Sequence, residues 1–169
     1  MKKMSSLCEL DSVYNVIEDG NTYSENAIKK ARHISLLTDK ICLGDDSGLE
    51  VEVLDGKPGI FSSRFAGERS SDEENIAKLL LQLINKPNRK ACFVCSLALV
   101  FPDGRQVIAE GRCEGIILHK PSGTSGFGYD PVFFSKELNK TMAELTLDEK
   151  NQMSHRARAV RELKKLLCE

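Results

Sequence analysis

The sequence predicts an α/β fold, with helices toward both ends of the chain and a β-rich stretch between them. Three segments carry this prediction: a helical repeat of apolar residues after residue 22, a near-continuous apolar run over residues 91–101, and an amphipathic stretch over residues 154–167. The 169 residues suit a single domain, residues 1–169, and are enough to bury a core.

Charge and hydropathy exclude several classes of function. The formal net charge is −1, so no overall basic field draws the chain to nucleic acid or to an anionic membrane. No apolar run approaches the length of a membrane span, and the opening MKKMSSLCEL lacks the apolar segment of a signal peptide. We therefore expect a cytoplasmic protein that binds neither nucleic acid nor membrane.

The first predicted elements are a helix and a short strand. Residues 22–25, Thr-Tyr-Ser-Glu, have the form of a capping box. Apolar residues then recur at helical spacing, at Ala27, Ile28, Ala31, Ile34 and Leu37. The run ICLG, residues 41–44, predicts a short strand that ends at two acids, Asp45 and Asp46.

The rest of the chain alternates strands with turn and cap signals. In order, we expect a strand at 49–54, a turn at 55–59, a helix from Ser70 or Ser71 to about Ile84, a strand at 91–101, a hairpin turn at 102–104, and strands at 106–111 and 113–118. A glycine-rich loop at 121–131 and a capping box at 146–149 precede the last helix. That helix places five apolar residues on one side: Ala159, Val160, Leu163, Leu166 and Leu167.

The cysteines favour packing over chemistry. Of the six, only Cys92 and Cys95 form a C-x-x-C pair, and they lie inside the apolar run ACFVCSLALV. A structural zinc site would need a second pair or histidines at ligand spacing, and redox chemistry is disfavoured inside a buried strand. We expect these residues to be small core hydrophobes.

Two adjacent acids and two polar segments are the candidates for chemistry. Asp45 and Asp46 follow a strand, where ligand sites collect in α/β sheets, although an Asx-type turn explains them equally well. The segment TSGFGYDP, residues 124–131, offers backbone N–H groups and the rings of Phe127 and Tyr129 as stacking surfaces. The segment EKNQMSHR, residues 149–156, offers Lys150, His155 and Arg156 as a helix begins, where free N–H groups favour anions.

Taken together, these stretches resemble the inosine triphosphate pyrophosphatases, the Ham1 or non-standard purine nucleoside triphosphate pyrophosphatase family. The resemblance covers roughly residue 14 to the end, and its stretches are SENAIKKARH, DDSGLEVEVLDGKPGIFSSRFAG, SGFGYDPVFF, TMAELTLDEKN and SHRARA. It implies an elongated, curved mixed sheet flanked by helices, with two lobes and a nucleotide cleft between them. It also implies a homodimer. The implied reaction is magnesium-dependent hydrolysis of deaminated purine nucleoside triphosphates, such as those of inosine, deoxyinosine and xanthosine, to the monophosphate and pyrophosphate, which cleanses the nucleotide pool.

The resemblance also implies roles for the acids. Asp46 would be the general base that activates the attacking water, and it would help to hold Mg²⁺ with support from Asp45. Glu18 lies where the family keeps an acidic metal ligand, but its register is imperfect, so a solvated turn acid explains it equally well. Glu25 is explained by the capping box alone.

The remaining implied roles concern the substrate. Ser47 would donate a hydrogen bond to it, and Lys30 would reach its phosphates, although a helix lysine is more often simply solvated. By similarity, the base and sugar pocket and the other substrate contacts are formed by Phe127, Gly128, Tyr129, Asp130, Lys150, His155 and Arg156. Donors such as Arg156 or His155 would favour a base with a carbonyl at C6 over adenine, because adenine leaves them unpaired.

One part of the family pattern has no counterpart in the sequence. The family opens with a strand and a Thr/Ser-x-Asn-x-x-Lys loop that grips the triphosphate, and we expect this opening βα unit to be missing here. The letters of Ser24 to Lys29 fit the pattern but belong to the separate SENAIKKA helix. Three hypotheses therefore stay open: an active pyrophosphatase, a degenerate member that acts as a nucleotide-binding or dimerisation module, and, more distantly, a Maf-type nucleotide pyrophosphatase.

Overall fold

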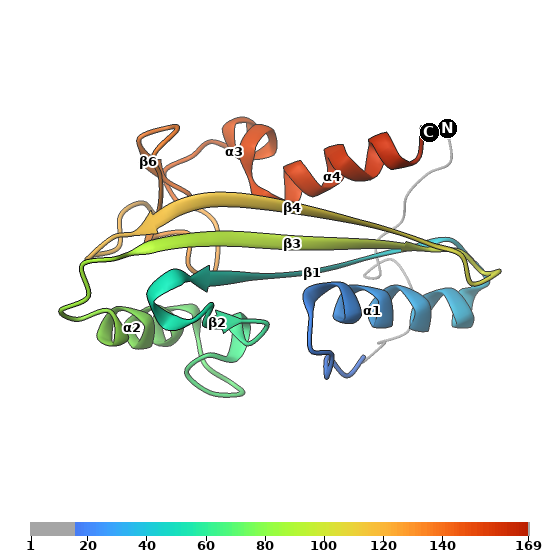
Figure 1. Cartoon of the computed structure of the whole chain (residues 1–169), viewed down its shortest axis with the longest axis horizontal. Helices are drawn as coiled ribbons and strands as arrows, with labels where there is room; N and C mark the ends of the chain where they lie inside the picture. The colour runs from blue at the N-terminus through green and yellow to red at the C-terminus, as the bar shows by residue number, and fades with distance from the viewer. Residues whose placement is uncertain (1–15, 169) are drawn as a thin grey trace.

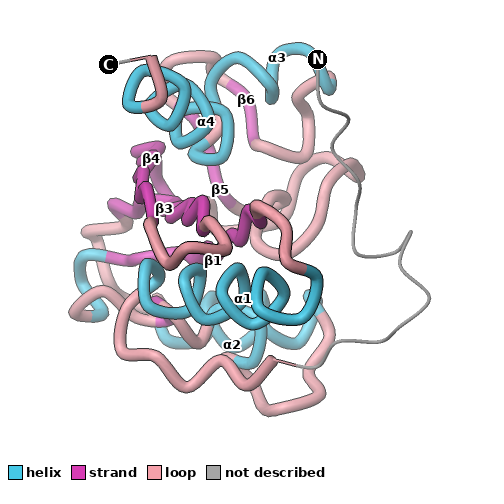
Figure 2. The backbone as a smooth tube through the Cα atoms, turned by 90° about the vertical axis from the view of Figure 1, so that its right-hand side faces the viewer, coloured by secondary structure: helices cyan, strands magenta, loops and turns pink. Residues whose placement is uncertain are grey.

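The computed structural model describes residues 16–168 as a six-stranded sheet between two layers of helices (Figure 1). In chain order its elements are α1 (Tyr23–Thr38), β1 (Cys42–Val51), the 3-10 helix η2 (Glu52–Leu54), β2 (Pro58–Gly59), the 3-10 helix η3 (Ser62–Arg64), α2 (Asp72–Gln82), β3 (Lys90–Val100), β4 (Gln106–Ile117), β5 (Phe133–Ser135), β6 (Lys140–Thr141), α3 (Leu147–Met153) and α4 (His155–Leu166). Figure 2 shows α1 and α2 below the sheet and α3 and α4 above it. The predicted α/β fold with flanking helices is confirmed.

The sheet has the strand order β2-β1-β3-β4-β5-β6. Its three long strands, β1, β3 and β4, run the length of the molecule (Figure 1). All five strand pairs of the described residues are antiparallel, so the parallel pairing that a mixed sheet implies is not found in them. The pair β3–β4 is closed by the expected hairpin turn, in which Gly104 has a φ of 89°.

The two acids lie inside a strand, and the prediction that a strand ends before them was wrong. Strand β1 continues through them to Val51, pairing Asp45 with Leu97 and Asp46 with Ser96 of β3. The ladder uses backbone groups, which every residue type here supplies, so polar side chains do not end it. The predicted strand at 49–54 is only the end of β1 and the turn η2, and the two strands predicted at 106–118 are one, β4.

Glycines on either side of Asp46 let other segments approach the same face of β1. A Cβ atom at Gly44 would lie 2.4 Å from the carbonyl oxygen of Ala27 and 3.0 Å from the amide nitrogen of Ala31 in α1. At Gly48 it would lie 2.3 Å from the carbonyl oxygen of Gly59. Because side chains alternate along a strand, Gly44, Asp46 and Gly48 share one face. Helix α1 therefore rests directly on the backbone beside Asp46.

The predicted helix caps are confirmed, but the capping box at α1 is incomplete, because Glu25 accepts from the N–H of Asn21 and not from that of Thr22. Thr22, Ser71 and Thr146 cap α1, α2 and α3, and each accepts a hydrogen bond from a backbone N–H of the first turn. In α4, the predicted apolar side is narrower than expected. Only Ala159 and Leu163 of that set are buried, and the other three are 39–50% exposed.

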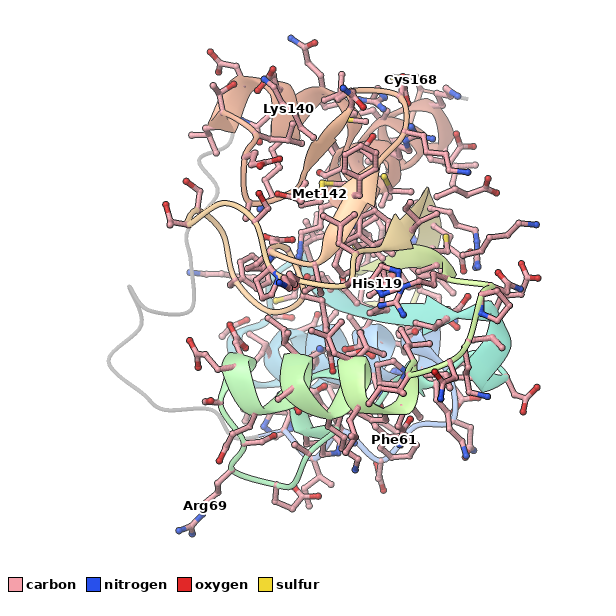
Figure 3. All side chains as sticks on the ribbon, turned by 90° about the vertical axis from the view of Figure 1, so that its left-hand side faces the viewer. Phe61, Arg69, His119, Lys140, Met142 and Cys168 are labelled. Carbon is pink, nitrogen blue, oxygen red and sulfur yellow. The ribbon has the colours of Figure 1, made fainter. Side chains whose placement is uncertain are left out.

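Two clusters of buried apolar residues divide the core. The larger one surrounds Leu49, Phe93 and Phe133, and the smaller one lies under α4 around Cys95 and Leu97. Figure 3 shows Met142, which belongs to the larger cluster, among packed side chains, whereas Arg69 projects away from the protein.

Cys95 and Cys113 are buried as expected, whereas Cys42 and Cys92 are half-buried and Cys168 is exposed. Cys92 and Cys95 are three residues apart on β3, so they point to opposite faces of the sheet and do not form a redox pair. Burial raises the pKa of both thiols above the usual value. Cys8 lies outside the described residues. Among residues 16–168, we find no helix whose length and apolar character would let it cross a membrane.

Candidate active site

Asp46 is a buried carboxylate held by two donors from α1. The amide Nδ2 of Asn26 donates to Oδ2 of Asp46 at 3.1 Å, and the ammonium of Lys30 donates to Oδ1 at 3.2 Å. The two donors are four residues apart, so they lie on one face of the helix. Burial raises the pKa of Asp46, while Lys30 and Asn26 oppose that rise and Glu18 adds to it.

Lys30 joins Asp46 to a second acid. Its Nζ lies 3.4 Å from Oε1 of Glu18, whose backbone carbonyl also accepts from Arg64 at 3.4 Å. One ammonium therefore lies between two carboxylates, which brings Glu18, Lys30 and Asp46 together. Because both carboxylates reach the same ammonium, they lie close enough together to suit Mg²⁺, which takes one or two protein carboxylates and completes its shell with water and phosphate. Among the described residues, no three acidic, His or Cys side chains form a closed metal cluster.

Asp45 points to the other face of the sheet. Its Oδ2 accepts from Nε of Arg156 at 3.2 Å, so this acid is tied to α4. The structure does not bring Asp45 to the pair formed by Glu18 and Asp46, because neighbouring residues of a strand face opposite ways. Ser47 shares the face of Asp45, and its buried hydroxyl has no hydrogen-bond partner in residues 16–168.

The glycine-rich loop is shaped by Asp130. Its Oδ2 accepts from the backbone N–H of Phe127 and from the ammonium of Lys150, and the residue is only 4% exposed. Gly126 has a φ of 86°, and a Cβ there would lie 2.1 Å from Oδ2 of Asp130, so only glycine fits. The N–H of Gly128 donates to Asp72 at the start of α2. Asp130 therefore fixes the positions of Lys150 and of the loop through these two hydrogen bonds.

The two aromatic residues of this loop differ in their surroundings. Phe127 is 62% exposed, with the ammonium of Lys150 5.6 Å and the guanidinium of Arg156 5.2 Å from its ring centre. Tyr129 is only 4% exposed, and its hydroxyl donates to the carbonyl of Ser62 at 3.0 Å. The expectation that Tyr129 offers a stacking surface was wrong, since the core already covers its ring. Phe127 is the aromatic residue of this loop that still exposes ring surface to a ligand, beside the two cations.

His155 is a buried, neutral imidazole at the start of α4. Its ring stacks on Phe93 with 4.9 Å between ring centres, and Nε2 lies 3.4 Å from a guanidinium nitrogen of Arg156. Burial, with Arg156 and Lys150 adding to it, lowers the pKa of His155 to about 3. If Nε2 accepts from Arg156, the ring proton lies on Nδ1, which has no partner in the described part of the chain.

Acid should destabilise the protein through His155. Between its ordinary pKa of 6.5 and its folded pKa of about 3, the unfolded chain binds a proton that the folded chain does not. Its contribution to stability is therefore complete above pH 6.5 and is lost as the pH falls toward 3. At pH 5 the loss is about 2 kcal/mol, taking 1.36 kcal/mol per pKa unit.

The measurement is the free energy of unfolding in urea at pH 7 and at pH 5. The variant His155→Gln should show a smaller loss between these two values than the wild type. His33→Gln, on the exposed side of α1, is the matched control and should keep the wild-type loss. A His155→Gln variant with the full wild-type dependence on pH would contradict a neutral, buried His155.

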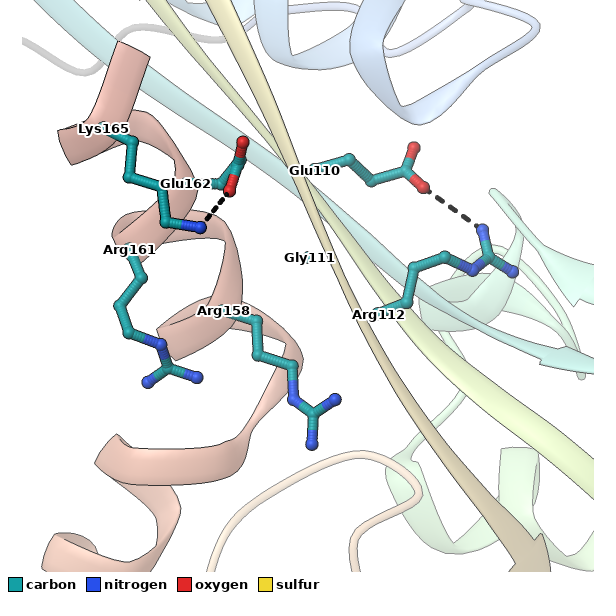
Figure 4. A pocket seen from close by; sticks show the side chains of 7 residues that line it. All are labelled: Glu110, Gly111, Arg112, Arg158, Arg161, Glu162 and Lys165. Atoms are coloured by element: carbon teal, nitrogen blue, oxygen red, sulfur yellow. Dashed lines mark hydrogen bonds and ion pairs between the residues drawn. The ribbon is translucent and has the colours of Figure 1, made fainter. Parts of the chain in front are cut away.

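A separate hollow of about 330 Å³ lies between β4 and α4, and Asp46 is not part of its lining (Figure 4). Its walls carry cations, but each already has a partner. Arg112 pairs with Glu50 and Glu110, Arg161 donates to the carbonyl of Gln152, and Lys165 pairs with Glu162. None of the residues that line this hollow is among those that the sequence predicts for the site.

Sequence reasoning missed three residues of the site. Asn26 holds Asp46, and Asp72 holds the glycine-rich loop through Gly128. Ser96 faces Asp46 across the strand pair, and its buried hydroxyl has no hydrogen-bond partner among residues 16–168. One signal was available for Asn26, because it is a polar residue beside the apolar stripe of α1. No local pattern marks the other two, since their partners lie 50 or more residues away.

Comparison with known proteins places the chain in a wider group. Residues 1–166 match the Ham1 family, so the similarity begins at residue 1 and not near residue 14 as expected. A protein of Bacillus cereus named dITP/XTP pyrophosphatase is 48% identical over 171 residues, covering 99% of this chain and 83% of its own. A protein of the same name from Shouchella clausii is 47% identical, covering 97% and 84%. The solved structure of a HAM1 protein from Coxiella burnetii matches with a TM-score of 0.87 at 40% identity, covering 96% of this chain and 89% of its own.

Proposed function

The chain belongs to the Ham1 family, and we propose that it hydrolyses deaminated purine nucleoside triphosphates, such as those of deoxyinosine and xanthosine, to the monophosphate and pyrophosphate. The observation that carries this proposal is the buried Asp46 with Lys30 and Glu18 beside it, within a chain nearly half identical to proteins named for this activity. These relatives favour an enzyme over a module that only binds nucleotide.

The substrate would lie across the edge of β1 that faces away from β3. Among residues 16–168, strand β2 pairs with Leu49 and Glu50 alone on this edge, so a ligand there would reach Asp46 on one face and Arg156 on the other. The triphosphate would meet Lys30. One of its phosphate oxygens would replace one of the two carboxylates that now pair with the Lys30 ammonium. The base would stack on Phe127, between Lys150 and Arg156.

Asp46 would act as the general base. Its carboxylate would accept a proton from a water molecule, and the resulting hydroxide would attack the α-phosphorus. The bond from that phosphorus to the oxygen bridging the α- and β-phosphates would break, and pyrophosphate would leave with that oxygen. Burial suits this role, because a raised pKa makes the carboxylate a stronger proton acceptor. Asn26 and Lys30 keep it oriented while it acts.

We assign magnesium to the pair formed by Glu18 and Asp46. Both carboxylates lie within 3.4 Å of the Lys30 ammonium, and this closeness to one point supports their holding one metal ion together with the triphosphate. A bound Mg²⁺ would neutralise the charge on the phosphate oxygens. Asp45, expected from the resemblance to support this pair, would instead fix Arg156.

Arg156→Ala should reduce the preference for inosine triphosphate over adenosine triphosphate. Only the C6 carbonyl of the deaminated base accepts from the guanidinium, so the ratio of the two kcat/KM values should narrow about tenfold, as for one lost charged hydrogen bond. Arg158→Ala is the matched control, because this arginine of the same helix donates to Met153 and Glu137 instead. Equal losses for both nucleotides would mark Arg156 as a phosphate or packing residue.

The proposed function is tested by release of pyrophosphate from inosine, xanthosine and adenosine triphosphates, with and without magnesium. We expect turnover of the first two only with the metal, and no turnover of any of the three would refute the proposal. We further propose that the enzyme works in the cytoplasm, where the nucleotide pool lies, and as a homodimer, which sedimentation would test.

A further inference from the structure

The side chain of Asn26 occupies the centre of the proposed site. It is 1% exposed, although it lies on a helix whose other buried positions are mostly apolar or small. Both ends of its amide are used: Oδ1 accepts from the backbone N–H of Gly20 at 2.8 Å, and Nδ2 donates to Oδ2 of Asp46 at 3.1 Å. A buried amide with both ends paired has a single orientation.

The orientation of this amide follows from its partners. The N–H of Gly20 can only donate, so it must face the amide oxygen, and the amide nitrogen is then turned toward Asp46. The carboxylate therefore always meets a donor on Oδ2. Lys30 occupies Oδ1, which restricts the carboxylate at both oxygens and leaves one lone-pair direction on each for other ligands.

Asn26 also joins two segments that are far apart in sequence. Gly20 lies two residues after Glu18, and Asp46 lies in β1. A side chain at Gly20 would not fit, because its Cβ would lie 2.6 Å from Oδ1 of Asn26. One amide thus sets the position of the loop carrying Glu18 relative to the strand carrying Asp46.

We propose that Asn26 is a positioning residue for hydrolysis, which orients the Asp46 carboxylate by its N–H donor and fixes the Glu18 loop by its oxygen. This inference rests on the proposed function, since it takes Asp46 as the base. Asn26 touches neither the base pocket nor the exposed phosphate side, so its loss should act on the chemical step and not on substrate binding.

Two substitutions separate the two ends of the amide. Asn26→Ala removes both contacts. Asn26→Asp keeps an acceptor for the N–H of Gly20 but replaces the donor to Asp46 with a second carboxylate. The new carboxylate repels that of Asp46 and offers it no N–H donor, so the base loses its orientation. Both variants should lose about 10–100-fold in kcat, the usual effect of removing a partner of a catalytic or metal-binding group, with KM within about threefold of the wild type.

Asn75 provides the matched control. It is a buried asparagine of α2, 2% exposed, whose Oδ1 accepts from the N–H of Ala66 and whose Nδ2 donates to the carbonyl of Ser63. Asn75→Ala and Asn75→Asp should lower the melting temperature as the Asn26 variants do, because each also breaks buried hydrogen bonds. Their kcat, measured well below that temperature, should stay near the wild-type value.

The outcomes discriminate between the possibilities. An Asn26→Asp variant with wild-type kcat beside an impaired Asn26→Ala would show that the residue only holds the Glu18 loop, and would overturn its action on Asp46. Losses no greater than those of the Asn75 variants, or losses confined to KM, would overturn the positioning role. A wild type that turns over no deaminated nucleotide would refute the proposed function itself, and the inference with it.

Discussion

Asp46→Asn is expected to lower kcat for inosine triphosphate by about a hundredfold or more, the usual effect of losing a positioned general base. The amide keeps the shape of the carboxylate but cannot accept the proton of the attacking water, and it removes a charge from the pair with Glu18. The fold should survive, because an amide at this position can still contact Lys30 or Asn26. The measurement is the initial rate of pyrophosphate release at saturating nucleotide and magnesium.

The control is Asp55→Asn, in the exposed turn after η2, where a φ of 52° suits asparagine as well as aspartate. This variant should keep the wild-type kcat. An Asp46→Asn enzyme that retains more than about a tenth of the wild-type kcat would show that another group takes the proton.

Gly44→Ala is expected to damage stability and catalysis together. The new Cβ would meet the backbone of α1, 2.4 Å from the carbonyl oxygen of Ala27, and backbone cannot turn aside as a side chain can. Helix α1 would have to move off β1, at a cost of about 3 kcal/mol, the upper part of the usual range for overpacking. The same movement would draw Asn26 and Lys30 away from Asp46, so kcat should fall at least about tenfold even at temperatures where the variant is folded.

The checks are urea unfolding and the rate of pyrophosphate release. Leu43→Ala is the neighbouring control, because Leu43 is 41% exposed and points to the other face of β1, so it should change both quantities little. A stable and fully active Gly44→Ala enzyme would show that α1 does not need its close approach to the strand.

The elements with local signals were predictable from the sequence, and the site was predictable only in part. Thr22, Ser71 and Thr146 mark helix starts because a cap acts within three residues. The end of strand β1 was wrongly predicted to precede Asp45 and Asp46. The strand continues because β3 pairs with it and α1 packs on it, and the local pattern shows neither contact. Once that strand is continuous, its twofold alternation separates the two acids onto opposite faces.

Other site residues depended on distant partners. Tyr129 was expected to stack on a ligand, but its hydroxyl meets Ser62, 67 residues away, and its ring is enclosed. Lys30 and Glu18 were named from the resemblance. Their ion pair depends on how α1 packs, and the local sequence does not show that packing. Asn26 stayed unnoticed because its two partners lie on either side of α1 in the sequence.

Strands β3 and β4 pass through both apolar clusters without a break, and this affects how the protein comes apart. Phe93 and Cys113 lie in the larger cluster, and Leu97 and Ala109, on the same two strands, lie in the smaller one. The part of the protein around one cluster cannot unfold while β3 and β4 stay intact in the part around the other. We therefore expect one cooperative unfolding transition. Amide hydrogens at the centre of β3 should exchange with solvent most slowly, through global unfolding alone, and any motion of one half against the other must bend two continuous strands.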